Sequence, residues 1–300
     1  MDIKNLELWY QKNKRSLIFR KTKEPYKIWV SEIMLQQTQV ETVLPFFDRF
    51  MNVYPTVFDL ANTDELTLHK VVEGLGYYRR FRYMQEAAKV IVNEFDGIFP
   101  NTYDEVIKLP GIGKYTAGAI MSIAYDLPYS ALDGNVIRVL SRYLNISEDM
   151  RLEKNKKILN EINQSYIEKS HPNLYTQAMM ELGAMICRPQ NPKCDKCPIA
   201  LYCQAHAMGI ETKLPYLSKL KEKKEFNYIT LIIKDESYYY LYKRTEDLLK
   251  NMYMYPQFES ESIQSVLLNL EAEGIILEVI NYIGNYKHVF THLIWHMDVY

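Results

Sequence analysis

All four cysteines of the 300-residue chain lie between residues 187 and 203, in the spacing C-x6-C-x2-C-x5-C. Disulfides are not expected in a reducing cytosol. Four thiolates so close in sequence can converge on one metal centre, either tetrahedral zinc or a cubane iron–sulfur cluster. Zinc ribbons usually have two C-x2-C pairs. One such pair between wider gaps fits a loop that is wrapped around a metal centre larger than a single ion. Cys187, Cys194, Cys197 and Cys203 therefore predict a [4Fe–4S] cluster, with zinc or unliganded thiols as alternatives.

The segment Leu109–Gly118, LPGIGKYTAG, joins two helical patterns. Pro110 with Gly111 and Gly113 allows a tight hairpin whose backbone N–H groups point outward where the second helix begins. Unpaired N–H groups and the positive helix end coincide there, which suits a phosphate. An ordinary helix–helix turn is the alternative, because G-x-G alone is common.

Two carboxylates stand in positions suited to acid–base chemistry. Glu32 is surrounded in sequence by Trp29, Ile33 and Leu35, so in a closed pocket desolvation would favour its protonated form and let it donate a proton. Asp133 opens a helical stretch, as an N-cap would. Two carboxylates in different protonation states are the groups that break glycosidic bonds. A simple helix cap and an exposed polar face remain the alternatives.

Composition is that of a globular chain, with 48% hydrophobic and 24% charged residues. It excludes disorder, a collagen-like fibre and a small disulfide scaffold. The net charge of −1 combines an acidic end, with five basic and ten acidic residues in 226–300, and a slightly basic remainder. No run of about 18 apolar residues predicts a membrane span, and the start has no signal-peptide pattern. We expect a cytoplasmic protein.

Helical periodicity dominates residues 1–208, in stretches that are separated by short Pro- or Gly-containing breakers. These stretches are 28–51, 79–94, 114–125, 133–144, 153–168 and 173–187. From Phe226 the texture changes to β-branched and aromatic runs, and 228–233 with 238–242 predict a hairpin around 234–237. Residues 209–225, rich in lysine, read as a solvated basic linker. The sequence predicts a helical domain, a linker and a smaller β-rich domain at 226–300.

Four further segments point to a family: WVSEIMLQQTQV (29–40), GLGYYRR (74–80), LDGNVIRV (132–139) and QAMMELGAMIC (177–187). Together with the hairpin and the cysteine spacing, they resemble the endonuclease III superfamily of helix–hairpin–helix DNA glycosylases, and within it the MutY family of adenine DNA glycosylases. The resemblance covers essentially all of 1–208. It implies a mainly α fold in two lobes, a six-helix module at about 25–130 and a cluster lobe built from 1–24 and 131–208.

The implied activity is base excision repair, by hydrolysis of the N-glycosidic bond of adenine paired with 8-oxoguanine or G in double-stranded DNA. Glu32 would protonate adenine at N7 and later help to activate water. Asp133 would stay ionised and stabilise the oxocarbenium-like sugar, and Asn135 would hold both in place. Tyr115 stands where bifunctional relatives carry a lysine, and a phenol cannot form a Schiff base. The resemblance therefore implies a monofunctional enzyme with weak or no lyase activity.

The resemblance also implies which residues bind the DNA and the target adenine. Gln37 and Tyr77 match positions that insert into the duplex, although a surface glutamine and a core tyrosine are the plainer interpretations. Arg20 and Gln177 would line the adenine pocket, next to Phe19, where the family often has tryptophan. Gly111, Gly113 and Lys114 would contact the DNA backbone. The implied protein is a monomer in the bacterial cytoplasm, associated with the nucleoid and with no membrane.

The β-rich end resembles the family's lesion-recognition domain, which is α/β and Nudix-like. Phe290, Thr291 and His292 match its Phe-Ser-His loop, which reaches the 8-oxoguanine; a strand start with an incidental histidine is the alternative. The signature of Nudix hydrolases is absent. Residues 293–300 alternate as a strand up to the last residue, so the domain looks incomplete beside its relatives.

Two rival functions stay open at this point. One is a thymine/uracil mismatch glycosylase or an endonuclease III of the same fold, and Tyr115 is compatible with some of these. The other is a non-catalytic iron–sulfur DNA-binding sensor, which would be expected to lack the acid or the aspartate. Both carboxylates are present.

Overall fold

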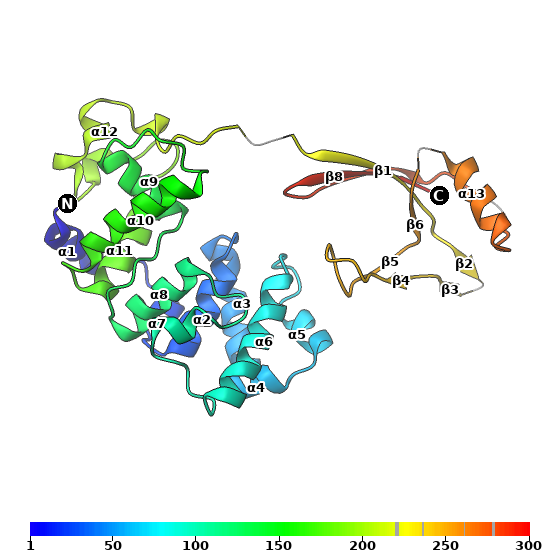
Figure 1. The fold of residues 1–300 in the computed structure, drawn as a ribbon, viewed down its shortest axis with the longest axis horizontal. Helices are drawn as coiled ribbons and strands as arrows, with labels where there is room; N and C mark the ends of the chain where they lie inside the picture. Colours follow the sequence, from blue (N-terminus) through cyan, green and yellow to red (C-terminus); the bar gives the residue numbers. More distant parts are fainter. Residues whose placement is uncertain (220–221, 236, 261, 278–279) are drawn as a thin grey trace. The chain divides into compact units, whose positions relative to one another are not determined.

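Helices build the first 218 residues of the chain, and strands with a helix build the rest (Figure 1). The structure is a computed structural model that describes residues 1–219, 222–235, 237–260, 262–277 and 280–300. It divides into two compact units, 1–218 and 219–300.

The helices of the first unit are α1 (Ile3–Asn13), α2 (Pro25–Leu35), α3 (Val40–Val53), α4 (Val57–Asn62), α5 (Glu65–Val71), α6 (Arg79–Glu94), α7 (Tyr103–Val106), α8 (Lys114–Tyr125), α9 (Gly134–Tyr143), α10 (Glu153–Ile167), α11 (Pro172–Met185) and α12 (Gln204–Ala207). Short 3-10 turns are η1 (Ile18–Arg20), η2 (Cys194–Lys196), η3 (Ala200–Tyr202) and η4 (Glu211–Lys213). Five of the six predicted helical stretches match α6, α8, α9, α10 and α11 to within two residues.

Two separate hydrophobic cores hold the first unit together. One is built by α2 to α8 around fully buried side chains such as Trp29, Phe50 and Phe81. The other is built by α1, α9, α10 and α11 around Leu6, Leu140 and Tyr175. Helix α11 packs against α1 and α9, and also against α8, so it joins the two cores.

The predicted helical stretch 28–51 is wrong as a single helix, because the chain turns between α2 and α3. Gln37 has φ 56°, a left-handed conformation that a helix cannot continue through. The carbonyls of Ile33, Met34 and Gln36, where α2 ends, accept hydrogen bonds from the buried guanidinium of Arg80. A side chain distant in sequence therefore ends this helix, which periodicity alone does not reveal.

The second unit contains a four-stranded mixed sheet in the order β6-β1-β8-β7. Its strands are β1 (Lys224–Thr230), β6 (Gln257–Glu259), β7 (Gly284–Val289) and β8 (Leu293–Val299), with β1 parallel to β8 and the other pairs antiparallel. Helix α13 (Ile263–Ala272) supplies Val266 and Leu270 to a small core with Ile229 and Leu231. The predicted strand at the end of the chain is confirmed as β8.

The predicted hairpin around 234–237 is only partly right. Residues 228–230 pair with β6 and β8 rather than with 238–242. The local hairpin is shorter, with β2 (Lys234–Asp235) paired to β3 (Tyr238–Tyr239), and a further pair joins β4 (Tyr242–Lys243) to β5 (Tyr253–Met254). The strand β1 pairs with the distant β8 instead of with 238–242, because this pairing buries Ile229 and Trp295. Among the described residues, no helix combines the length and apolarity that crossing a membrane requires.

Candidate active site

Glu32 lies on α2 with 1% of its surface exposed, and both carboxylate oxygens are engaged. Oε1 accepts a hydrogen bond from Nη2 of Arg20 at 2.7 Å, and Oε2 accepts one from the hydroxyl of Tyr115 at 2.6 Å. Burial, together with the charges of Glu32 and Asp133, raises the pKa of Tyr115 well above its ordinary value. Tyr115 therefore stays a phenol that donates a proton in a hydrogen bond.

Arg20, on η1, still has donor capacity next to Glu32. Its Nη2 contacts the sulfur of Met180 at 3.6 Å as well as Glu32. Its Nη1 is buried and has no hydrogen-bond partner among the described residues. A buried N–H group without a partner costs free energy, and a bound base with an acceptor atom would satisfy it. Phe19 beside it is fully buried and packs edge-on against Phe47, so it belongs to the core.

Gln177, on α11, is buried and its amide is held at both ends. Its Oε1 accepts from the hydroxyl of Tyr10 at 3.0 Å, and its Nε2 donates to Oδ1 of Asn173 at 3.0 Å. Burial raises the pKa of Tyr10 to about 12, with Arg20 opposing the shift, so the two residues interact. Gln177 thus lies in the surroundings of Arg20 with a fixed amide orientation.

Asp133 caps α9 with a half-buried carboxylate. Its Oδ1 accepts from the backbone N–H of Val136 at 2.7 Å, and its Oδ2 accepts from Nδ2 of Asn135 at 2.8 Å. Burial raises the pKa of Asp133, with the charge of Glu32 adding to the shift and the two hydrogen bonds opposing it. The helix-cap interpretation is correct, and a chemical role for the same carboxylate stays a prediction.

Arg138, one turn further along α9, joins this carboxylate to the cysteine loop. It donates from Nη2 to Oδ1 of Asn135 at 2.8 Å and to the carbonyl of Gly183 at 2.7 Å, and from Nε to the carbonyl of Cys187 at 2.7 Å. Gly183 allows this close approach, since a Cβ there would lie 2.5 Å from Cβ of Asn135. The orientation of Asn135 therefore depends on Arg138 and α11.

Gln37 and Tyr77 are both exposed, and both have left-handed backbone conformations, with φ 56° and φ 49°. Tyr77 is 51% exposed, so its interpretation as a core tyrosine is wrong. Arg80 is 7% exposed and donates hydrogen bonds to the hydroxyl of Thr38 and the carbonyl of Met34, which lie near Gln37 in the chain. It also donates to the carbonyl of Gly76, next to Tyr77. Left-handed conformations of non-glycine residues cost energy and persist where the surroundings impose them. One guanidinium thus holds both loops.

The segment before α8 forms the predicted turn. Gly111 has φ 74° and lies against Tyr83, where a Cβ would approach to 2.6 Å, so its glycine is required. Gly113 is the N-cap of α8, with no atom within 4 Å of where a Cβ would stand. Lys114 is exposed while Tyr115 faces Glu32. The first turn of α8 therefore presents N–H groups and a cation on an open surface.

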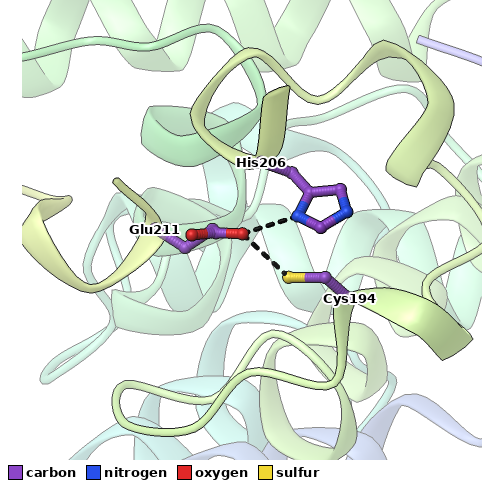
Figure 2. Close-up of side chains that lie close together, drawn as sticks. All are labelled: Cys194, His206 and Glu211. Atoms are coloured by element: carbon purple, nitrogen blue, oxygen red, sulfur yellow. Dashed lines mark hydrogen bonds and ion pairs between the residues drawn. The ribbon is translucent and has the colours of Figure 1, made fainter. Parts of the chain in front are cut away.

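The four cysteines line one cavity, together with apolar side chains of α9 and α11. The buried guanidinium of Arg142 donates from Nη1 to the sulfur of Cys187 at 3.4 Å and to the carbonyl of Arg188 at 2.7 Å. Convergent thiols, apolar walls and a cationic donor to sulfur fit an iron–sulfur cluster. Burial raises the pKa of Cys194 to about 12, with Glu211 adding to it (Figure 2), so a bound cation is needed to hold its thiolate.

In the second unit, Phe290, Thr291 and His292 form the short connection between β7 and β8. Phe290 packs edge-on against Trp295, and its carbonyl accepts from Nζ of Lys223 at 2.6 Å. Thr291 and His292 are exposed. They lie in a turn rather than in a strand, which disagrees with the plainer alternative of a strand start.

Comparison with known proteins identifies the family. A sequence profile described as HhH-GPD superfamily base excision DNA repair protein matches residues 30–168. An adenine DNA glycosylase of Buchnera aphidicola subsp. Baizongia pistaciae is 36% identical over 303 residues, which covers 95% of this chain and 81% of the relative. The chain belongs to the adenine DNA glycosylase family.

Solved structures share the fold of this family member. A thermostable thymine-DNA glycosylase matches with a TM-score of 0.63 and 28% identity, covering 69% of this chain and 95% of the other. Endonuclease III in a non-covalent complex with DNA matches with a TM-score of 0.58 and 22% identity, covering 69% and 94%. These matches confirm the predicted helix–hairpin–helix glycosylase fold with an added strand-containing region. The Nudix-like character of that region stays a prediction.

Several residues that organise the site of this adenine DNA glycosylase family member were not singled out from the sequence. Arg80 and Arg138 lie inside the motifs GLGYYRR and LDGNVIRV, but a motif does not state which groups its arginines contact. Tyr10 carried no signal among 25 tyrosines. Arg138 lies three residues after Asn135, the helical spacing that lets side chains meet, and this could have identified it.

Proposed function

We propose that this chain hydrolyses the N-glycosidic bond of adenine paired with 8-oxoguanine or G in double-stranded DNA, as a step of base excision repair. The observation that carries the proposal is the buried group formed by Glu32, Arg20 and Tyr115, next to the carboxylate of Asp133. A thymine mismatch activity has weaker support, because the adenine relative matches at higher identity and along nearly the whole chain. A non-catalytic sensor would need neither carboxylate.

The target adenine must leave the base stack before it can reach the buried carboxylate. The unpartnered Nη1 of Arg20 and the fixed amide of Gln177 would then meet the polar edge of the base. A base that engages Arg20 would compete with Glu32 for the same guanidinium. Glu32 then gives its proton to N7, and the C1′–N9 bond breaks with its electron pair leaving on adenine.

The sugar left behind carries positive charge at C1′ and O4′. Asp133, oriented by Val136 and Asn135, would face this charge with an ionised carboxylate. Water adds at C1′, and its proton goes to Glu32, which restores the starting state. No lysine replaces Tyr115 beside Glu32, so base release would occur without strand cleavage through a Schiff base.

Cys187, Cys194, Cys197 and Cys203 would hold a [4Fe–4S] cluster, which supplies structural cross-linking since four protein ligands leave no position for substrate. The exposed Arg188, Lys193 and Lys196 on the same loop would meet DNA phosphates. Gly111, Gly113 and Lys114 would bind a second stretch of backbone. Gln37 and Tyr77 would enter the duplex beside the vacated adenine.

Phe290, Thr291 and His292 would reach the 8-oxoguanine opposite the adenine. The support is that Thr291 and His292 are exposed in a turn whose base is fixed by Phe290 against Trp295. We also propose that the protein acts as a monomer among nucleoid DNA in the cytoplasm, since Glu32 and Asp133 come from one chain.

Single-turnover release of base from A:8-oxoG, A:G, T:G and U:G duplexes tests the proposal. Adenine should be released from the first two, and Glu32→Gln should slow release by at least about 100-fold while the protein still binds DNA. Release of thymine or uracil at a comparable rate, or full activity of Glu32→Gln, would contradict it. The paired change Thr291→Ala with His292→Ala should lower the A:8-oxoG to A:G rate ratio by about tenfold; an unchanged ratio would remove the loop from lesion recognition.

A further inference from the structure

Three side chains of different donor type meet beside the cysteine loop (Figure 2). Cys194 begins η2, His206 lies on α12 and Glu211 begins η4. One ligand atom from each lies within 4.8 Å of the other two. Nδ1 of His206 is 2.6 Å from Oε1 of Glu211, and the same oxygen accepts from the sulfur of Cys194 at 3.5 Å.

We propose that these three side chains bind one Zn²⁺ ion whenever no cluster is assembled on the cysteines. Thiolate, imidazole and carboxylate are the ligands that zinc takes in proteins, and three of them leave the fourth tetrahedral position to water. The inference concerns metal binding by the chain and does not depend on its base-release activity.

The spacing of the ligand atoms suits one tetrahedral ion. Zinc bonds of about 2.3 Å to sulfur and about 2.0–2.1 Å to nitrogen and oxygen place sulfur and oxygen about 3.5 Å apart, and nitrogen and oxygen about 3.3 Å apart. The Cys194–Glu211 distance of 3.5 Å already matches. The His206–Glu211 distance of 2.6 Å must open slightly as the ion replaces the shared proton, and His206 can move because 44% of its side chain is exposed.

Charge also selects this end of the loop for a single cation. At the other end, the guanidinium of Arg142 lies 3.4 Å from the sulfur of Cys187 and repels a second cation. The carboxylate of Glu211 attracts one.

Binding has a simple proton balance. The S–H bond of Cys194 breaks, a sulfur–zinc bond forms, and one proton leaves to solvent. The proton that His206 shares with Glu211 at Nδ1 moves to Nε2, so neutral His206 offers the lone pair of Nδ1 to the ion and releases no further proton. Cys194 cannot serve this ion and a four-cysteine cluster at once, so the zinc form and the cluster form exclude each other.

Co²⁺ titration of the cluster-free full-length chain tests the site, because Co²⁺ replaces Zn²⁺ and absorbs in proportion to its thiolate ligands. One equivalent should bind with the charge-transfer intensity of a single thiolate, and one equivalent of Zn²⁺ should displace it. Cys194→Ser should abolish binding, and His206→Phe or Glu211→Gln should weaken it about tenfold or more. The matched controls Cys187→Ser and Cys203→Ser should bind Co²⁺ as tightly as the parent chain.

A spectrum of four thiolates would overturn the proposal, as would equal weakening by Cys187→Ser and His206→Phe. Cys197→Ser gives a second preparation that cannot complete four cysteine ligands and needs no chelator. It should retain the single-thiolate Co²⁺ site. A Cys197→Ser chain that keeps its helical circular dichroism but binds no Co²⁺, or a cluster-free chain that binds none, would also overturn it.

Discussion

Arg138 donates a hydrogen bond from Nη2 to Oδ1 of Asn135 at 2.8 Å. Through Nε, the same guanidinium holds the carbonyl of Cys187 at 2.7 Å, so the amide that orients Asp133 is tied to the first cysteine of the loop. A disturbance of the loop therefore reaches the carboxylate through three hydrogen bonds.

The change Arg138→Met removes this bridge with little change in side-chain volume. We expect single-turnover base release to slow by about 10- to 100-fold, because Asn135 loses the partner that orients it. The measurement is release from A:8-oxoG under saturating enzyme. The control Arg151→Met removes an exposed arginine that also donates to a backbone carbonyl, that of Ser218. If both variants slow base release equally, the hydrogen bonds of Arg138 to Asn135 and Cys187 do not specifically support base release.

Tyr115→Lys is expected to gain strand-cleaving activity. Tyr115 faces Glu32 at 2.6 Å, so an amine at this position would lie beside the reacting sugar and could attack C1′. Borohydride reduction during turnover should trap a covalent protein–DNA adduct. Tyr115→Phe, which loses the hydroxyl without gaining an amine, should give none. Absence of the adduct with Tyr115→Lys would place residue 115 away from the sugar.

The rate of base release should decrease as the pH is lowered. This decrease should begin at a higher pH than that at which an ordinary aspartate becomes protonated. Burial raises the pKa of Asp133, and only the ionised form can stabilise a cationic sugar. Because the folded-state pKa lies above the unfolded value, the ionised carboxylate also costs stability as pH rises through this range. The hydrogen bond from Asn135 opposes the shift.

Asn135→Ala removes that opposing hydrogen bond, so the acid limb of the rate profile should move to higher pH. Rates from A:8-oxoG measured across pH 4 to 8, a range of about four units around the titration region, give the limb directly. Asn145→Ala, whose amide contacts Met208 instead, should leave the limb in place. A limb that does not move with Asn135→Ala would mean that another group controls it.

The sequence singled out the cysteines by their spacing, and it singled out Glu32 and Asp133 mainly through the resemblance to the family, since a polar helix face or a helix cap explains either carboxylate alone. It said less about the residues that hold these groups in place. Arg80 and Arg138 act through backbone carbonyls distant in sequence, and a carbonyl leaves no trace in residue type. The Arg20 ion pair with Glu32 was missed for a similar reason, since pairing depends on how η1 packs against α2.

Helix positions were predicted well where apolar spacing decided them, as in α6 and α8, and poorly where a distant contact intervened. The break at Gln37 depends on Arg80, and the pairing of β1 depends on β8, about 70 residues later in the chain. The predicted hairpin around 234–237 is present, but its two strands are only two residues long each. Long-range pairing is the part of a fold that a single sequence specifies least visibly.

Arg80→Lys is expected to loosen the loops of Gln37 and Tyr77. A lysine keeps the charge but cannot donate at once to Met34, Thr38 and Gly76, so carbonyls buried in the parent lose their partners. We expect a stability loss of about 1–3 kcal/mol in urea unfolding. Without the guanidinium, the left-handed backbone at Gln37 and Tyr77 should relax to commoner conformations.

The specific consequence concerns DNA distortion rather than stability. With 2-aminopurine next to the target adenine, binding of the parent chain should raise fluorescence as the base unstacks, and Arg80→Lys should give a much smaller rise at saturating protein. Arg82→Lys, on the same helix and paired only loosely with Glu86 at 3.9 Å, controls for a change of arginine to lysine on α6. A stability loss with a full fluorescence rise would show that Arg80 supports the fold alone. In that case Gln37 and Tyr77 would reach the duplex without it.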